Sequence, residues 1–454
     1  MRRDDLELAS LWESYALASD GIATVPDVVD AWEEALARYY RAGSQRDVGR
    51  AEASMAHARL WSGNESLNRR VAQRAVERLE PFGEGADLAF ALFVLGRQLI
   101  ERGEVDEAEP LLWRARGIAG RVGDRRTETN ATISLGWTLQ ARRRGEETVR
   151  LFDEALEAAR AAGDLSLLLD ALEAVLSAAI EVKGDYPRAE TLCREAIEIA
   201  KRSGNLQKLA RTQLNLGYLL GEMGRLEEAS EPLEASLAGA TEVGDPTVIG
   251  SINGVIAIHR CLQGRLDDAQ RAFEARQVVF DGAKLGPITY VEEFDGLILG
   301  YLASGRGNDL EAAEALAAAN RRVSDARLSV WEGQILLFEC VRALVRLGRL
   351  EEATVVRGRL AGLAVSNIPP RAFLAWADGV LEPDPDRARD LLAEAAARFE
   401  ALGRRVDLGR CLLDLAAAEE RLGNEAWQLV ERGRGLLEAC GAMLFLRDRE
   451  GGTE

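Results

Sequence analysis

The chain has 454 residues, 47% of them hydrophobic and 29% charged, and a formal net charge of −18 at pH 7. Such a negative surface disfavours nucleic-acid binding, because phosphates are bound mainly by Lys and Arg. The longest uncharged run, residues 246–259, has 14 residues, whereas a membrane helix needs about 20, and the N-terminus lacks a signal-peptide core. We therefore expect a cytoplasmic protein without membrane contact.

Two helix pairs are predicted at the N-terminus, and neither shows a regular repeat. The first comprises residues 4–19 and 26–42, and the second comprises residues 46–62 and 65–80, with Gly63 at its turn and Pro81 after it. We predict degenerate repeats over residues 1–82.

From residue 83 a pattern recurs. The first helix of a pair carries Leu-Gly, and the second carries a small residue, a large apolar residue four positions later, and another small residue. This pattern reads Leu95-Gly96 with Ala108, Leu112 and Ala115, and Leu135-Gly136 with Thr148, Phe152 and Ala155. The basic run at residues 142–144 is expected to be a solvated helix end.

Residues 205–244 give the clearest copy. Leu209, Leu216 and Leu219 recur at helical spacing, and Gly217 lies between them, where glycine costs about 1 kcal/mol relative to alanine. We expect this glycine to allow close approach of the second helix at Ala229 and Leu233.

The later pairs are less regular, since Arg276 and Arg357 replace small or apolar residues. The final pairs comprise residues 369–381 with Ala388 and Leu392, and then residues 405–422 and 425–440. We predict core repeats over residues 83–362, divergent capping repeats over residues 363–446 and a disordered tail at residues 447–454.

The small residue after each turn recurs with a constant period. It falls at positions 108, 148, 189, 229, 269, 312 and 353, with spacings of 40, 41, 40, 40, 43 and 41 residues. A fixed period of this length is typical of stacked supersecondary units. The sequence therefore predicts an all-α, right-handed superhelical solenoid of about 10–11 antiparallel helix pairs, in which each pair contacts only its neighbours.

The Leu-Gly and Ala-x3-apolar marks, the repeated Gly-Asp joints and the closing segment LGRRVDLGRCLLDLAAAEERLG carry a family resemblance. The chain resembles tetratricopeptide repeats of the long, forty-residue kind, as in the C-terminal arm of large ATP-binding bacterial regulators of the LuxR type. The resemblance implies a sensor or docking arm. The chain contains no G-x4-G-K-[ST] motif for ATP phosphates.

Motifs for catalysis or metal binding are not found. His57 and His259 are the two histidines, and they lie about five repeats apart, so we expect no metal site and no cofactor. Five scattered cysteines are expected to be small apolar residues in a reducing compartment. We expect a protein that is not an enzyme.

A ligand is expected on the concave wall formed by the first helices. Aromatic, Arg and Asn side chains would provide stacking and hydrogen bonds there. The candidates are Phe93, Arg97, Asn130, Trp137, Arg211, Asn215, Tyr218, Tyr301 and Arg342, with His57, Phe90, Phe294 and Phe338 on the same wall. The alternative for each is packing between neighbouring repeats.

The favoured function is an interaction scaffold that binds a protein segment or peptide in its concave groove, within a bacterial transcription-regulatory or signalling assembly. The alternative is a sensor of a small molecule or pheromone peptide. A clamp for C-terminal carboxylates is disfavoured, because Gly254 and Ile258 stand where partners of Asn215 would be needed. Homo-oligomers remain open.

Overall fold

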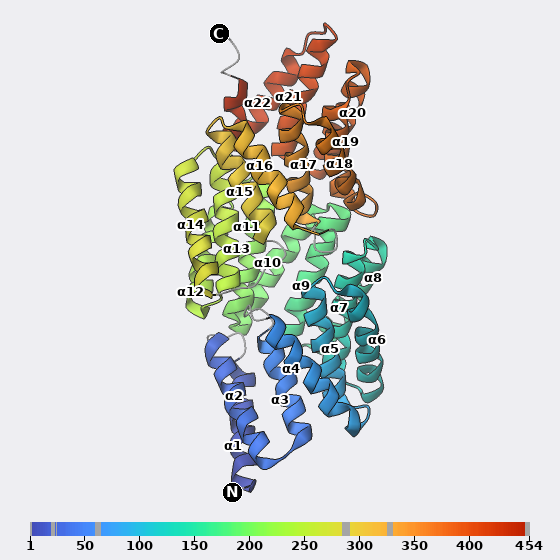
Figure 1. The fold of residues 1–454 in the computed structure, drawn as a ribbon, viewed down its shortest axis with the longest axis vertical. Helices are drawn as coiled ribbons and strands as arrows, with labels where there is room; N and C mark the ends of the chain where they lie inside the picture. The colour runs from blue at the N-terminus through green and yellow to red at the C-terminus, as the bar shows by residue number, and fades with distance from the viewer. Residues whose placement is uncertain are drawn as a thin grey trace.

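The computed structural model describes residues 2–19, 23, 25–59, 65–283, 291–324 and 330–449. Over these residues the chain forms eleven antiparallel helix pairs and no β-strand (Figure 1). The predicted all-α, right-handed superhelical solenoid is confirmed. The body is elongated, with the N-terminus at one end and the C-terminus at the other.

The helices alternate between an inner and an outer layer. The first helices of the pairs are α1 (Arg2–Ser19), α3 (Gln45–Ala58), α5 (Ala86–Glu101), α7 (Arg125–Ala141), α9 (Leu165–Ala178), α11 (Leu206–Glu222), α13 (Pro246–Leu262), α15 (Val291–Gly305), α17 (Trp331–Arg346), α19 (Ile368–Leu381) and α21 (Arg405–Arg421). The second helices are α2 (Val25–Ala42), α4 (Glu65–Leu79), α6 (Val105–Val122), α8 (Gly145–Ala162), α10 (Tyr186–Ser203), α12 (Ser230–Val243), α14 (Leu266–Ala283), α16 (Asp309–Arg322), α18 (Leu350–Leu363), α20 (Pro385–Leu402) and α22 (Trp427–Ala439). Three short elements are η1 (Glu80–Phe82), the π-helical turn η2 (Ala179–Lys183) and η3 (Met443–Arg449).

The Gly-Asp joints end one pair and begin the next. Gly244 adopts the left-handed conformation at the end of α12, with φ of 71°, a position that favours glycine. Asp245 follows as the N-cap of α13, and its Oδ1 accepts hydrogen bonds from the backbone N–H groups of Thr247 and Val248. Gly-Asp joints also precede α7 and α9, and a Gly-Asn joint precedes α11, which explains the sharp period of the repeat.

Within a pair, the glycine of the first helix lies against the large apolar residue of the second. A Cβ placed on Gly217 would lie 2.5 Å from Cγ of Leu233, and one on Gly136 would lie 2.2 Å from the ring of Phe152. The predicted reason for the helical glycine is therefore found in the packing. The side chain that needs the space is the large residue, four positions after the small one.

The irregular arginines are accommodated by ion pairs. Arg276 is fully buried, donates to Gly250 O at 2.7 Å and to Asp295 at 2.8 Å, and lies over the ring of Phe280. Arg357 donates to both carboxylate oxygens of Asp378, at 2.6 and 2.9 Å. Each arginine thus brings its charge into the pair together with a carboxylate from the next first helix.

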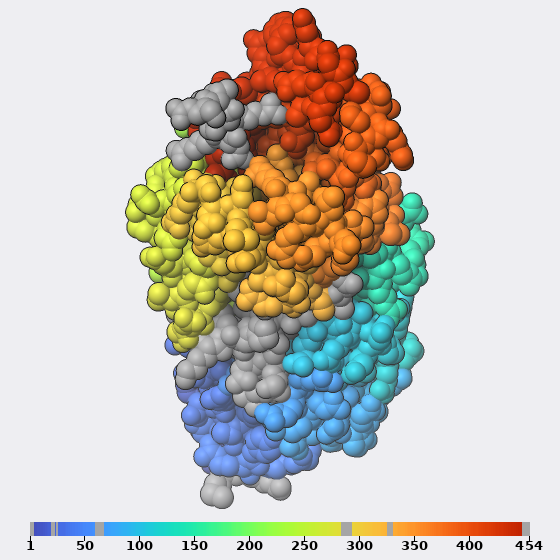
Figure 2. Space-filling view, turned by 45° about the horizontal axis from the view of Figure 1, so that its top comes forward, coloured from blue at the N-terminus to red at the C-terminus, as the bar shows by residue number. Residues whose placement is uncertain are grey.

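The solenoid closes on itself after about one superhelical turn. Arg404, just before α21, donates to Tyr186 Oη of α10 at 2.9 Å and lies 2.6 Å from Glu222 of α11. A Cβ on Gly184 would meet Leu402, and one on Gly145 would meet Ser366. In Figure 2 the orange segment that contains α17 and α18 accordingly lies against the teal segment that contains α8.

The expectation that each pair contacts only its sequence neighbours is therefore wrong. The superhelical twist returns α19–α21 to the surface of α8–α11, and the repeat period carries no direct signal for that return. The closure encloses the inner helices between two layers of the same chain.

Other predictions concern the surface and the chain ends. The five cysteines are free and buried, as expected for small apolar residues. None of the described helices combines the length and hydrophobicity needed to cross a bilayer. Residues 447–449 of the predicted disordered tail belong to η3, and residues 450–454 lie outside the described residues. The predicted boundaries at residues 82 and 362 stay predictions.

Candidate functional site

A cavity of about 410 Å³ lies on the inner wall of the superhelix. We call it the concave groove. Its wall comes from the first helices α5, α7, α9, α11, α13 and α15 and from the start of α17. The side chains used below are Arg97, Glu101, Trp137, Gln140, Arg143, Glu173, Glu181, Arg211, Asn215, Tyr218, Phe294, Trp331 and Glu332. A cavity of this size falls in the range of ligand-binding clefts.

Five of the nine predicted site residues line this groove together, namely Arg97, Trp137, Arg211, Asn215 and Tyr218. They come from α5, α7 and α11, of which α5 and α7 are in direct contact. The Leu-Gly register therefore placed these side chains on the concave face.

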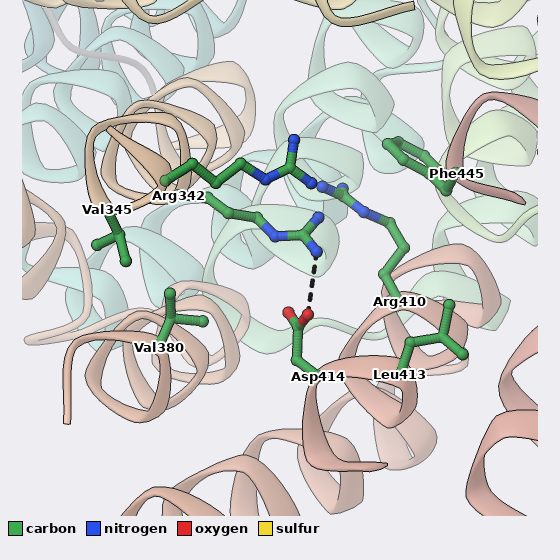
Figure 3. Close-up of a pocket in the computed structure, with 8 residues that line it drawn as sticks. Arg342, Val345, Val380, Arg410, Leu413, Asp414 and Phe445 are labelled. Carbon is green, nitrogen blue, oxygen red and sulfur yellow. Dashed lines mark hydrogen bonds and ion pairs between the residues drawn. The ribbon is translucent and has the colours of Figure 1, made fainter. Parts of the chain in front are cut away.

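The other four predicted residues lie elsewhere. Phe93 is 4% exposed and packs in an aromatic cluster with His57 and Phe90. It therefore packs between neighbouring repeats, which was the alternative to a place on the wall. Asn130 is partly buried and is not among the residues that line the groove. Tyr301 is buried and donates to Glu339 Oε1 at 3.2 Å. Arg342 lines a separate cavity beside α21 (Figure 3).

Of two further aromatic residues that were predicted for the wall, one lines the groove and the other does not. Phe294 lines the groove. Phe338 is fully buried and stacks on Trp376, with ring centroids 4.0 Å apart, so it belongs to the core.

One end of the groove is aromatic. The ring of Tyr218 lies 4.7 Å from Trp331 and 5.9 Å from Phe294 between centroids. Tyr218 Oη is buried and has no hydrogen-bond partner among the described residues. Burial, reinforced by the carboxylates of Glu332 and Glu222, raises the pKa of Tyr218 well above its ordinary value. The hydroxyl therefore stays protonated and can donate to a ligand.

The middle of the groove is polar and carries both signs of charge. Arg97 Nη2 lies 3.0 Å from Glu101, and Arg211 Nη1 lies 3.6 Å from Glu173. Gln140 donates to Ser177 Oγ at 3.1 Å, whereas its Oε1 is buried without a donor among the described residues. Paired charges, with an amide acceptor that has no donor among the described residues, suit a ligand that is itself polar but carries little net charge.

Arg143 occupies a strained backbone position. Its φ is 59°, at the turn where other pairs have Gly103, Gly224 or Gly264. A non-glycine residue in this conformation costs about 1 kcal/mol, and strained residues are concentrated at functional sites. Arg143 lies just after the end of α7, is partly exposed and lines the groove. The expectation that residues 142–144 form a solvated helix end stays a prediction.

Glu181 enters the groove from the π-helical turn η2 that ends the first helix of pair five. It accepts a hydrogen bond from Ser177 Oγ at 2.7 Å, and burial raises its pKa above the ordinary value. Single π-helical turns within helices are frequent at functional sites. The interval from position 148 to 189, which contains η2, has 41 residues instead of 40. The residue type gave no signal, and a spacing longer by one residue does not by itself identify a π turn.

Sequence reasoning also missed Trp331 and Glu332. They lie at the start of α17, three pairs after α11, and only the closure of the superhelix brings them beside Tyr218. Within the part of the chain that the structure describes, no group of three or more His, Cys, Asp or Glu residues is placed to hold a metal ion. The groove therefore offers stacking surface, donors and acceptors for binding.

The fold and the groove together define a tetratricopeptide-like solenoid with a concave binding cavity. Residues 167–242 match the family described as tetratricopeptide repeat. No curated protein sequence matches the chain.

Solved structures share the architecture at low sequence identity. A Rap protein complexed with competence and sporulation factor has 13% identity and a TM-score of 0.52, covering 85% of this chain and 99% of its own. NprR in complex with its cognate peptide NprX has 13% identity and a TM-score of 0.45, covering 86% and 98%. A signal-transduction ATPase with a tetratricopeptide-repeat sensor from Pyrococcus horikoshii has 15% identity and a TM-score of 0.44, covering 84% and 54%. The likeness to the Rap protein shows the fold alone.

Proposed function

We propose that the chain is a non-enzymatic scaffold that binds a short peptide or protein segment in its concave groove. The observation that carries the proposal is the convergence of Trp137, Tyr218 and Trp331 with paired Arg and Glu side chains on one cavity. The Rap protein of the same fold was solved with competence and sporulation factor bound, which supports a ligand of this kind.

The groove matches the chemistry of a peptide. Tyr218 Oη can donate to a carbonyl, and Gln140 Oε1 can accept from an N–H. Tyr218, Phe294 and Trp331 form an apolar wall for one side chain, and rigid aromatic anchors typically dominate binding energy. The pairs Arg97–Glu101 and Arg211–Glu173, in the middle of the groove, favour polar contacts with the ligand there.

The proposal extends to a regulatory or signalling assembly in a bacterial cytoplasm. A narrower kinship with the arm of LuxR-type regulators stays a prediction from the sequence. A small-molecule sensor is the second candidate, and the groove volume of about 410 Å³ favours it because it falls within the range for single ligands.

The test is selection of a binder from a random peptide library, followed by fluorescence anisotropy with groove variants. Tyr218→Phe removes only the hydroxyl and should raise Kd about three- to tenfold. Trp137→Ala should raise Kd about thirtyfold or more, as for a binding hot spot. Trp113→Ala, on the exposed outer face of α6, is the matched control and should leave Kd unchanged.

Two outcomes would count against peptide binding. One is selected peptides whose affinity is the same for wild type, Tyr218→Phe and Trp137→Ala. The other is a library that yields no binder while a metabolite raises the melting temperature, which would favour the sensor.

A further inference from the structure

A second cavity of about 240 Å³ lies beside α17, α19 and α21, and shares no lining residue with the concave groove. Figure 3 shows the side chains of Arg342, Arg410 and Asp414 directed into it, with Phe445 of η3 at its edge. Arg346 also lines it. We call it the arginine cavity.

The carboxylates near this cavity have their oxygens occupied by donors. Asp414 accepts from Arg342 Nη2 at 3.0 Å and from Trp376 Nε1 at 2.8 Å, one bond to each oxygen. Glu339 accepts from Arg410 through both oxygens, at 2.6 and 3.0 Å. Arg346 also lies 3.5 Å from the exposed Asp309 of α16, at the outer edge.

The three guanidinium groups therefore share the buried or half-buried carboxylates of Asp414 and Glu339, and Asp407 lies 4.0 Å from Arg410. The Arg410 side chain is 3% exposed, and its Nε is buried without an acceptor among the described residues. The pKa of Arg342 is lowered by its burial. Asp414 opposes this shift, and the neighbouring cations Arg410 and Arg346 act in the same direction as burial. An additional negative charge in the cavity would relieve this repulsion.

The rest of the lining is apolar. Val345, Val380, Leu413 and Phe445 border the guanidinium groups, and the volume exceeds that of a single water molecule several times over. Guanidinium groups bind oxyanions through paired, parallel hydrogen bonds. From this combination we propose that the arginine cavity binds a small organic dianion, with its oxyanion on Arg342, Arg346 and Arg410 and a short apolar part on the valines.

Such a ligand would hold three elements together. Phe445 of η3 lies over the Arg410 guanidinium, with 3.9 Å between Cζ and the ring centroid, and Arg342 and Arg346 stand one turn apart on α17. The dianion would therefore fix the C-terminal segment and α21 against α17, on the same helix α21 that follows the closure residue Arg404.

The test is thermal unfolding of the full chain with sodium phosphate, phenyl phosphate or succinate, against sodium chloride at equal ionic strength. At least one of the three dianions should raise the melting temperature by several degrees with a saturable dependence on concentration. Phenyl phosphate against succinate separates a phosphate ester from a dicarboxylate.

Variants connect the effect to the cavity. Arg346→Met, whose side chain is 35% exposed, should keep a folded chain and reduce the dianion affinity at least tenfold by titration calorimetry. Arg398→Met, on the exposed face of α20, should respond as wild type does. The proposal is overturned if no dianion exceeds chloride, or if the response survives unchanged in both Arg342→Met and Arg346→Met.

Discussion

His259 is 6% exposed on α13, and its ring fills the space that a side chain at Gly221 would need. Burial, with a contribution from Arg260, lowers the pKa of His259 to about 4 from 6.5. Between these two values the unfolded chain binds a proton on this histidine and the folded chain does not. The stability contributed by neutral His259 is therefore fully present above pH 6.5 and is lost as the pH falls towards 4.

We predict that lowering the pH from 7 to 4 costs up to about 3 kcal/mol through this residue. The measurement is urea unfolding at several pH values for wild type and His259→Leu. The difference between the two curves isolates the contribution of His259. It removes the contribution of carboxylates such as Glu222, whose pKa is raised by burial and which therefore change the stability with pH in the opposite direction. Parallel curves would contradict the assignment.

At this scale the sequence predicted some, but not all, of the side chains of the regular first helices that line the groove. Trp137, Arg211 and Tyr218 follow the Leu-Gly register, because a helix places residues on one face at a fixed spacing. Arg143 was not predicted as a groove residue because glycine normally occupies its position. Its place in the groove follows from its backbone conformation and not from the helical periodicity. Phe93 was predicted for the wall and instead packs between repeats.

The helix pair is the element that the sequence predicts best. Its ends are set by glycine and Asp or Asn, and its internal contact is set by the Leu-Gly and large apolar residues, all of which lie within about forty residues of each other. The π-helical turn η2 is the exception, because its extra residue changes the direction of Glu181, whereas in the sequence it lengthens the interval by only one residue.

Gly217→Leu tests the contact within pair six. The added side chain would enter the space that Leu233 occupies, so we expect the free energy of unfolding to fall by about 2–3 kcal/mol, in the upper range for overpacking. Gly358→Ala in α18 is the control: a Cβ there meets no atom within 4 Å, and alanine should add about 0.5–1 kcal/mol. Equal melting temperatures for Gly217→Leu and wild type would show that α11 and α12 are packed differently.

The whole molecule depends on contacts that no repeat period reveals. Arg404 joins Tyr186 and Glu222 across more than 180 residues of chain, and its Nε also donates to Asp407 at 2.7 Å. Sequence analysis predicted an open stack, because the twist per pair is a small quantity that accumulates over six pairs before two surfaces meet. The start of α17 joins the groove for the same reason.

We predict that Arg404→Met destabilises the fold by about 3–5 kcal/mol, since it leaves Glu222 and Asp407 buried without their cation. Solution scattering should report a larger radius of gyration as the closure loosens. Adding Glu222→Gln to Arg404→Met should recover part of the loss. If Arg404→Met changes stability by less than 1 kcal/mol and leaves the scattering curve unchanged, Arg404 does not hold the two layers together.

Because α21 meets α11 only at the correct distance along the spiral, the number of units between them is fixed. An open solenoid tolerates the gain or loss of an internal unit, since every new interface resembles the old ones. Here one additional forty-residue module between α12 and α17 would carry Arg404 past Glu222 and separate Trp331 from Tyr218. Repeat units can therefore be gained or lost without disturbing the closure only at the two ends of this chain.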